Sequence, residues 1–143
     1  MVKKVASPWM VVFFQRHKDD DSAEAVPGAI YLNSCPFTVQ REMFAILDAV
    51  AEVEPMRFRN SQVWKAMHGD MNGWYEARKK LKKHLYRVFC LLEREAEGLP
   101  GPSIVVITGM TKENETAFSS ADYAKVRTLG DEYRARLPRS IEL

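Results

Sequence analysis

Arg87 lies in a segment of otherwise mostly apolar residues, from Leu85 to Leu92, which predicts a buried strand. A guanidinium stays charged, and its burial is costly unless an anion or several acceptors lie close by. Two interpretations follow: an internal ion pair with Glu76 or Asp70, or an arginine held on a rigid sheet to bind a phosphate. The sequence leaves both open.

A lysine-rich turn joins this strand to the one before it. Residues 73–78 and 84–92 are rich in aromatic and β-branched residues and flank the sequence KKLKK, which predicts a β-hairpin. If the register places Arg78 and Arg87 on one face, the two guanidiniums form a bidentate phosphate clamp. Six further residues of the hairpin are candidates for RNA binding: Lys79, Lys80, Lys82, Lys83, His84 and Tyr75. The alternatives are a solvated turn and, for the tyrosine, ordinary sheet packing.

Charge is unevenly distributed along the chain. The whole chain carries 21 lysines and arginines, 19 acids and a net charge of +2. Six of the basic residues lie between Ala77 and Leu92, where no acid occurs, so a strongly cationic segment sits on a mildly acidic body. This pattern is typical of a phosphate-binding surface. Aromatic residues interleave with these charges, and aromatic rings beside basic groups stack on nucleotide bases.

Two histidines near the basic segment are candidates for general acid–base chemistry. His68 and His84 suit that task because the pKa of a free imidazole is about 6.5. A polar surface position is the alternative for each. The three histidines of the chain do not have metal-ligand spacing, and we find no glycine-rich phosphate loop or serine-nucleophile motif. We therefore expect neither a metal nor a cofactor.

Length and composition predict a single domain over residues 1–143. Hydrophobic residues make up 46% of the chain and charged residues 28%, as in soluble globular proteins. No apolar run reaches the roughly 18 residues of a membrane span, and no signal-peptide pattern opens the chain, so we expect a cytoplasmic protein. Cys35 and Cys90 match no zinc or disulfide pattern and are expected in the core.

Hydrophobic periodicity predicts four structured regions. They are a strand over residues 9–16, an amphipathic helix over 36–54, a sheet over 73–112 and a terminal helix over 119–137. Ser119 and Asp122 have the spacing of a capping box at the start of the last helix.

Three other segments complete the outline. Residues 29–32 are expected as a short extended piece, and residues 57–70 fit either a short helix or a strand. Residues 103–107 (SIVVI) form a continuous apolar run, typical of a strand buried on both faces. The order of strand, helix, strands and helix predicts an α+β fold: a small, mainly antiparallel (mixed) β-sheet with helices packed on one face.

Three stretches carry a resemblance to a known family. They are Trp74–Arg78 (WYEAR), Leu85–Cys90 (LYRVFC) and Ile104–Lys112 (IVVITGMTK). Their order resembles the RelE/HigB superfamily of bacterial toxins, and most of all its phage-derived branch, over residues 60–137. That family combines aromatic–Glu–x–Arg, Tyr-Arg-x-Phe-Tyr, an apolar strand, Gly-Phe-x-Lys-Lys and a terminal helix. The resemblance implies a RelE-like fold, cleavage of mRNA, usually on the ribosome, and neutralisation by a cognate antitoxin.

The resemblance also implies roles for individual residues. Arg87 matches the arginine that the family uses on the scissile phosphate, and Arg78 falls where members have Arg or Lys. Lys112 matches the first lysine of the Gly-Phe-x-Lys-Lys stretch, whereas Glu113 stands at the second. Phe118 falls about where some members place a catalytic tyrosine.

Two hypotheses of different classes follow. The first is a metal-independent endoribonuclease toxin: the RNA 2′-OH attacks the adjacent phosphate, the arginines stabilise the developing charge, and His68, Glu76 or Lys112 transfers protons. The second is a non-catalytic module of the same fold, a decayed toxin or an inhibitor of a protein target, that pairs with an antitoxin. The expected partners are mRNA, the ribosome and a helix-turn-helix antitoxin, without a membrane.

Overall fold

The computed structural model describes residues 9–58, 61–113 and 116–142. In chain order its elements are β1 (Met10–Phe14), α1 (Pro27–Ser34), α2 (Phe37–Val53), the 3-10 helix η1 (Pro55–Phe58), β2 (Trp64–Ala66), the 3-10 helix η2 (Gly69–Met71), β3 (Trp74–Leu81), β4 (His84–Glu93), β5 (Ser103–Glu113), α3 (Ser120–Arg134) and β6 (Ile141–Glu142). In this part of the chain, no helix has both the length and the apolar character needed to cross a membrane.

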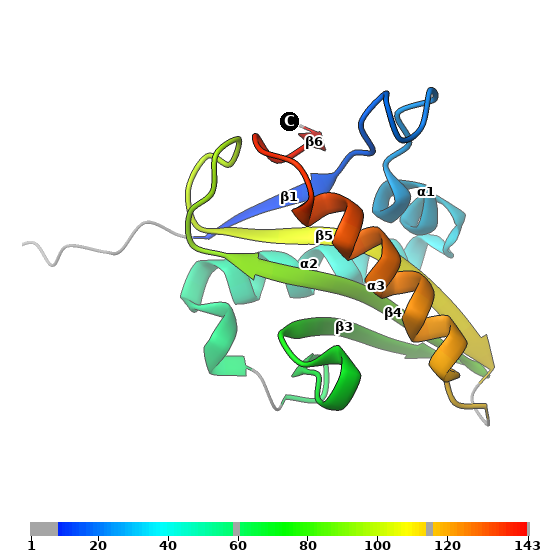
Figure 1. The fold of residues 1–143 in the computed structure, drawn as a ribbon. Helices are drawn as coiled ribbons and strands as arrows, with labels where there is room; N and C mark the ends of the chain where they lie inside the picture. The colour runs from blue at the N-terminus through cyan, green and yellow to red at the C-terminus, as the bar shows by residue number, and fades with distance from the viewer. Residues whose placement is uncertain (1–8, 59–60, 114–115, 143) are drawn as a thin grey trace, which may run out of the picture.

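The six strands form one mixed sheet in the order β2-β3-β4-β5-β1-β6 (Figure 1). β1 runs parallel to β5, and the other neighbouring pairs are antiparallel. The predicted hairpin is confirmed as β3 and β4, joined by a tight turn at Lys82 and Lys83. The strand expected over residues 103–107 is confirmed within β5, where all five residues are buried. The α+β class and the mixed, mostly antiparallel sheet are thus confirmed.

The helices cover both faces of the sheet, so the prediction that they pack on one face is wrong. α1 and α2 pack on one face through residues such as Leu32, Val39 and Leu47. α3 packs on the opposite face through Val126 and Tyr133. In Figure 1, α3 crosses in front of the sheet and α2 lies behind it. The reason is that β4 and β5 present apolar side chains to both sides, and each apolar face needs a cover that excludes water. We call the two sides the α2 face and the α3 face.

Residues 29–32, expected as an extended piece, lie inside helix α1, so that prediction is also wrong. Pro27 occupies the first turn of α1, where its missing N–H leaves no hydrogen bond unmade. Tertiary contacts hold this helix against β5. The ring of Tyr31 lies so close to Gly109 that no Cβ would fit there, and its hydroxyl donates to the carbonyl of Met110 (2.9 Å).

The segment over residues 57–70 contains both kinds of structure that its sequence left open. Its first two residues end η1, and residues 64–66 form the edge strand β2, which pairs with β3. Trp64 of β2 is completely buried, and its indole N–H donates to the carbonyl of Pro55 (2.9 Å). Cys35 and Cys90 are free and buried, which confirms their expected place in the core.

Helix α3 begins at a capping box, as predicted. The Ser119 hydroxyl accepts from the Asp122 backbone N–H, and the Asp122 carboxylate accepts from the Ser119 backbone N–H. Further along, Gly130 lies directly on the Trp74 indole of β3. The missing side chain at this position therefore allows the helix to approach the sheet closely.

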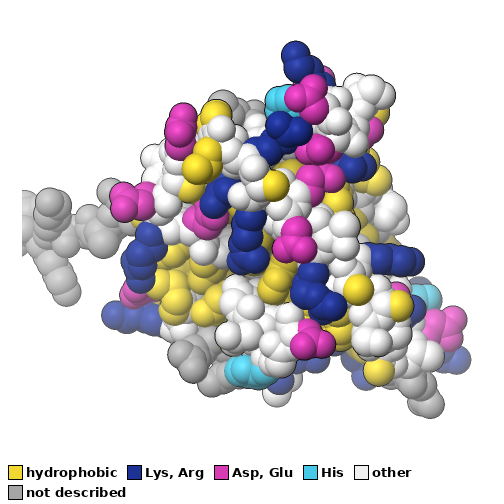
Figure 2. All heavy atoms as spheres, in the orientation of Figure 1, with side chains coloured by type: hydrophobic (Ala, Val, Ile, Leu, Met, Phe, Trp, Pro, Cys, Tyr) yellow, Lys and Arg dark blue, Asp and Glu magenta, His cyan; other side chains and the backbone are white. Residues whose placement is uncertain are grey.

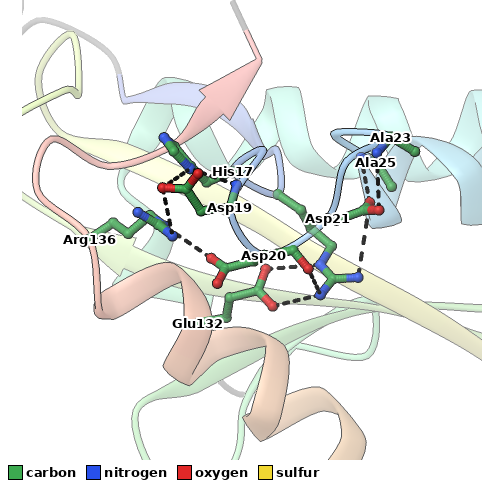
Figure 3. Close-up of polar contacts among 9 residues, drawn as sticks. His17, Asp19, Asp20, Asp21, Ala23, Ala25, Glu132 and Arg136 are labelled. Atoms are coloured by element: carbon green, nitrogen blue, oxygen red, sulfur yellow. Dashed lines mark hydrogen bonds and ion pairs between the residues drawn. The ribbon is translucent and has the colours of Figure 1, made fainter.

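The C-terminal end of α3 is tied to the loop that follows β1 (Figure 3). Arg16 donates two hydrogen bonds of 2.9 Å to the carboxylate of Glu132. Arg136 donates to Asp20 at 3.0 Å, which adds a second link between the same two segments. These contacts hold α3 in place across the sheet.

We expect Gly130→Ala to lower the free energy of unfolding by about 1–3 kcal/mol, although alanine has the higher helix propensity. A Cβ at this position would lie 2.4 Å from Cζ2 of Trp74, a buried ring that cannot move aside cheaply. Urea denaturation measures the loss, and Thr128→Ala on the exposed side of α3 is the control. If the two variants were equally stable, the contact between Gly130 and the Trp74 indole would be able to accommodate a Cβ.

Candidate functional site

The register of the hairpin brings Arg78 and Arg87 together as direct partners on β3 and β4. Glu76 pairs with Phe89, which belongs to the core on the α3 face. Because side chains alternate along a strand, Glu76, Arg78 and Arg87 all lie on the α3 face. The prediction that the two arginines share a face is confirmed. We call these three residues the charged triad.

The Glu76 carboxylate lies between the two guanidiniums. Its Oε1 is 3.5 Å from Nε of Arg78, and its Oε2 is 3.8 Å from Nε of Arg87. Glu76 and Arg87 are only 9% and 7% exposed. The ion pair that the sequence allowed for Arg87 is therefore present with Glu76. However, one carboxylate faces two arginines, so the charged triad keeps an excess positive charge.

The charged triad also keeps unused hydrogen-bonding capacity. Oε2 of Glu76 and Nε of Arg78 are buried, and neither has a hydrogen-bond partner in the part of the chain that the structure describes. One amino group of Arg87 donates to the carbonyl of Tyr86 (3.1 Å), which orients the guanidinium. A buried polar atom without a partner is costly, so this arrangement favours an added anion that accepts from the arginines.

Burial shifts the protonation of the groups around the charged triad. Burial raises the pKa of Glu76 above its ordinary value, and the two neighbouring arginines oppose that shift. Burial and the adjacent Arg78 lower the pKa of Arg87, which still stays charged at neutral pH. Burial raises the pKa of Tyr123 as well, with Glu76 adding to the effect. A carboxylate with a raised pKa is better suited to accept a proton near neutrality.

A pocket of about 410 Å³ opens beside the charged triad, between the β2–η2 segment and α3. Glu76 lines it, together with His68 and Asp70 from one side and Tyr123 and Arg127 from α3. We call it the helix pocket. It contains groups that can exchange protons, an aromatic ring and a cation, which suits a ligand that is polar and has a flat ring.

The sequence reasoning missed two residues of this pocket. In the sequence, Tyr123 has the spacing of an apolar position of the terminal helix, and nothing there sets Arg127 apart from other surface residues. The two residues are four positions apart, so they lie on the same face of α3. That spacing was the available signal, but it becomes informative only when α3 is known to cover the face that carries Glu76.

Lys112 and Phe118 lie on the same side of the sheet. Lys112 of β5 makes an ion pair of 3.2 Å with Asp122 at the start of α3. The guanidinium carbon of Arg87 lies 6.0 Å from the centre of the Phe118 ring, within the range of a cation–π contact. Tyr123 rather than Phe118 supplies the phenolic group near the charged triad, since it lies on the pocket that Glu76 lines.

Three of the predicted RNA-binding residues, Tyr75, Lys79 and His84, point to the face of the sheet opposite the charged triad. Tyr75 points to the α2 face and stacks on Trp64, with ring centres 5.4 Å apart. Lys79 makes an ion pair of 2.7 Å with Glu42 of α2. His84 packs beside Tyr86, which also belongs to the α2 face. The exposed lysines Lys82 and Lys83 lie in the turn, and Lys80 follows Arg78 on the α3 face.

The surface seen from the side of α3 carries mixed charge. Basic and acidic side chains are interspersed with apolar ones, so this face does not carry one uniform basic patch (Figure 2). Among residues 9–58, 61–113 and 116–142, no group of three or more His, Cys, Asp or Glu side chains is arranged to hold a metal ion.

Comparisons with protein-family models, with curated proteins and with solved structures find no match for this chain. The function of this chain is therefore inferred from the residues of the site and their geometry.

Proposed function

We propose that this protein is the toxin of a bacterial toxin–antitoxin system, a metal-independent endoribonuclease that cleaves mRNA on the ribosome. The observation that carries the proposal is the charged triad: two arginines on adjacent strands that share one buried carboxylate beside an open pocket. The sequence resemblance to the RelE/HigB superfamily supports the choice of mRNA and of an antitoxin as partners.

Each member of the charged triad has a role in this reaction. Glu76 removes the proton from the ribose 2′-OH, whose oxygen then attacks the adjacent phosphorus. Arg78 and Arg87 hold the phosphate and stabilise the charge that develops on its oxygens. The P–O5′ bond breaks, and the products are a 2′,3′-cyclic phosphate and a 5′-hydroxyl, whose proton comes from an acid on the far side.

The position of the acid follows from the in-line geometry of the attack. His68 lines the same pocket as Glu76, so both lie on the attacking side. Along β4, Glu76 lies opposite Phe89, Arg87 comes next on the same face, and Lys112 lies opposite Leu85. Lys112 is therefore on the side of Arg87 that faces away from Glu76. Lys112, held by Asp122, is therefore our choice for protonating the leaving oxygen, and His68 for contacting the ribose.

Cleavage of a short synthetic RNA tests the proposal. In buffer containing EDTA, we expect products that end in a 2′,3′-cyclic phosphate and a 5′-hydroxyl, identified by mass spectrometry. A single 2′-fluoro substitution at the cleaved nucleotide should block the reaction, because the nucleophile is then missing. If free RNA stays intact, the same assay is made with mRNA on translating ribosomes. Intact mRNA there too, or products with a 3′-hydroxyl, would refute the proposal.

One observation favours the non-catalytic alternative. An apolar groove of about 340 Å³ runs along α2 on the opposite side of the sheet, lined by Ile46, Ala49, Phe58 and Val63 among others. Such a groove suits an amphipathic segment of a protein partner. Tight binding to a small protein encoded in the neighbouring reading frame, without binding to RNA or ribosomes, would favour this alternative.

A further inference from the structure

We propose that the RNA strand crosses the site in one direction, with its 5′ nucleotide in the helix pocket and its 3′ side at the hairpin turn. The proposal rests on the function proposed above and adds the polarity of the substrate. Its basis is a second hollow, on the other side of the charged triad, whose charge differs from that of the helix pocket.

The second hollow has a volume of about 330 Å³ and lies along the end of β3 that does not pair with β2. We call it the hairpin crevice. Arg78 and Arg87 both line it, together with Lys80, whereas Glu76 lines the helix pocket. Lys79 and Glu42 also line the crevice, but they neutralise each other in an ion pair of 2.7 Å. The charged triad therefore separates two hollows of different character.

The hairpin crevice suits a phosphate. The buried Nε of Arg78 lacks a hydrogen-bond partner, and the exposed Lys80 has no ion pair among the described residues. The helix pocket suits a base and its ribose instead, because Tyr123 offers a ring for stacking while Asp70 and Arg127 offer an acceptor and donors for base edges. A bare phosphate is disfavoured there by Asp70 and Glu76.

Glu76, Arg78 and Lys80 follow one another on a single face of β3. Two residues along a strand advance about 6.7 Å, which is on the scale of one nucleotide in an extended single strand. The base that activates the 2′-OH must lie beside the nucleotide on the 5′ side of the scissile phosphate. With Glu76 in that role and the arginines on the phosphate, the next phosphate in the 3′ direction falls at Lys80.

Two isomeric probes test this polarity by equilibrium binding. Both are non-cleavable 2′-fluoro dinucleotides with one terminal phosphate, which is at the 3′ end in one probe and at the 5′ end in the other. We expect Lys80→Gln to weaken binding of the 3′-phosphorylated probe about threefold and to leave the 5′-phosphorylated probe unchanged. Lys18→Gln, which removes an exposed lysine from the loop after β1, should leave the affinity of both probes unchanged.

The opposite preference, or an equal effect of Lys80→Gln on both probes, would overturn the polarity. The cleavage assay on 2′-OH RNA separates this result from the proposed function. A protein that cuts RNA but shows no difference between the probes refutes the polarity alone. A protein that shows the expected difference but never cuts RNA supports the polarity of binding and refutes the nuclease.

Discussion

Arg87→Lys is expected to slow RNA cleavage by about 100- to 1,000-fold, the size of effect seen when one preorganised donor to a developing charge is removed. Lysine keeps the positive charge beside Glu76 but loses the planar fork that holds two phosphate oxygens at once. The fork of Arg87 is oriented by its bond to the carbonyl of Tyr86, which a flexible ammonium cannot reproduce. Single-turnover cleavage of a synthetic RNA, or of mRNA on ribosomes, measures the loss.

Arg41→Lys is the matched control for this experiment. Arg41 is an exposed arginine on α2, over the ring of Phe37, on the side of the sheet away from the charged triad. We expect this variant to cleave at the wild-type rate. Thermal unfolding of both variants checks the fold, and we expect Arg87→Lys to stay folded because lysine keeps a positive charge beside Glu76. A full rate in Arg87→Lys would exclude a bidentate role for this arginine.

Glu76→Gln is expected to lower the rate of RNA cleavage by about 100-fold or more. The same substitution should strengthen anion binding. The amide has nearly the same shape but cannot accept the proton of the 2′-OH. It also removes the negative charge that opposes a phosphate between Arg78 and Arg87, so a 2′-fluoro dinucleotide should bind at least about tenfold more tightly. Isothermal titration calorimetry and the cleavage assay measure the two effects on one protein.

The pH dependence of cleavage gives a further test of Glu76. The wild-type value of kcat/KM should fall at low pH as Glu76 becomes protonated. Because burial raises the pKa of Glu76, this fall should begin above the range of an ordinary glutamate. Any activity that remains in Glu76→Gln should not show this fall of kcat/KM at low pH.

Asp48→Asn is the control, since Asp48 is an exposed carboxylate of α2 on the side of the sheet away from the charged triad. We expect this variant to keep the pH profile of the wild type. Weaker rather than stronger anion binding in Glu76→Gln would mean that Glu76 orients the arginines instead of competing with the ligand.

Local patterns in the sequence determined those elements whose structure depends on neighbouring residues. The hairpin, the strand over residues 103–107, the amphipathic helix α2 and the capping box of Ser119 and Asp122 were all predictable. Periodicity, turn residues and caps act within a few positions along the chain, so the sequence carries their signal directly. The sequence also identified Arg78, Arg87 and Glu76 as candidate site residues of these strands.

Only the tertiary structure decided which of these groups meet. The expected extended piece at residues 29–32 lies in helix α1, and its Tyr31 packs on Gly109, which is far away in the sequence. Helices cover both faces because β4 and β5 are apolar on both sides, which the continuous run in β5 suggested but the predicted arrangement ignored.

The lysine-rich segment shows the same limit most clearly. Along the sequence, Lys79 and Lys80 are neighbours, yet one is paired with Glu42 on the α2 face and the other continues the row from Glu76 and Arg78. Likewise, Tyr123 joined the candidate site because α3 crosses the face that carries the charged triad. Alternation along a strand assigns side chains to two sides, but which side becomes a site depends on what packs there, and that is determined by contacts between residues far apart in the chain.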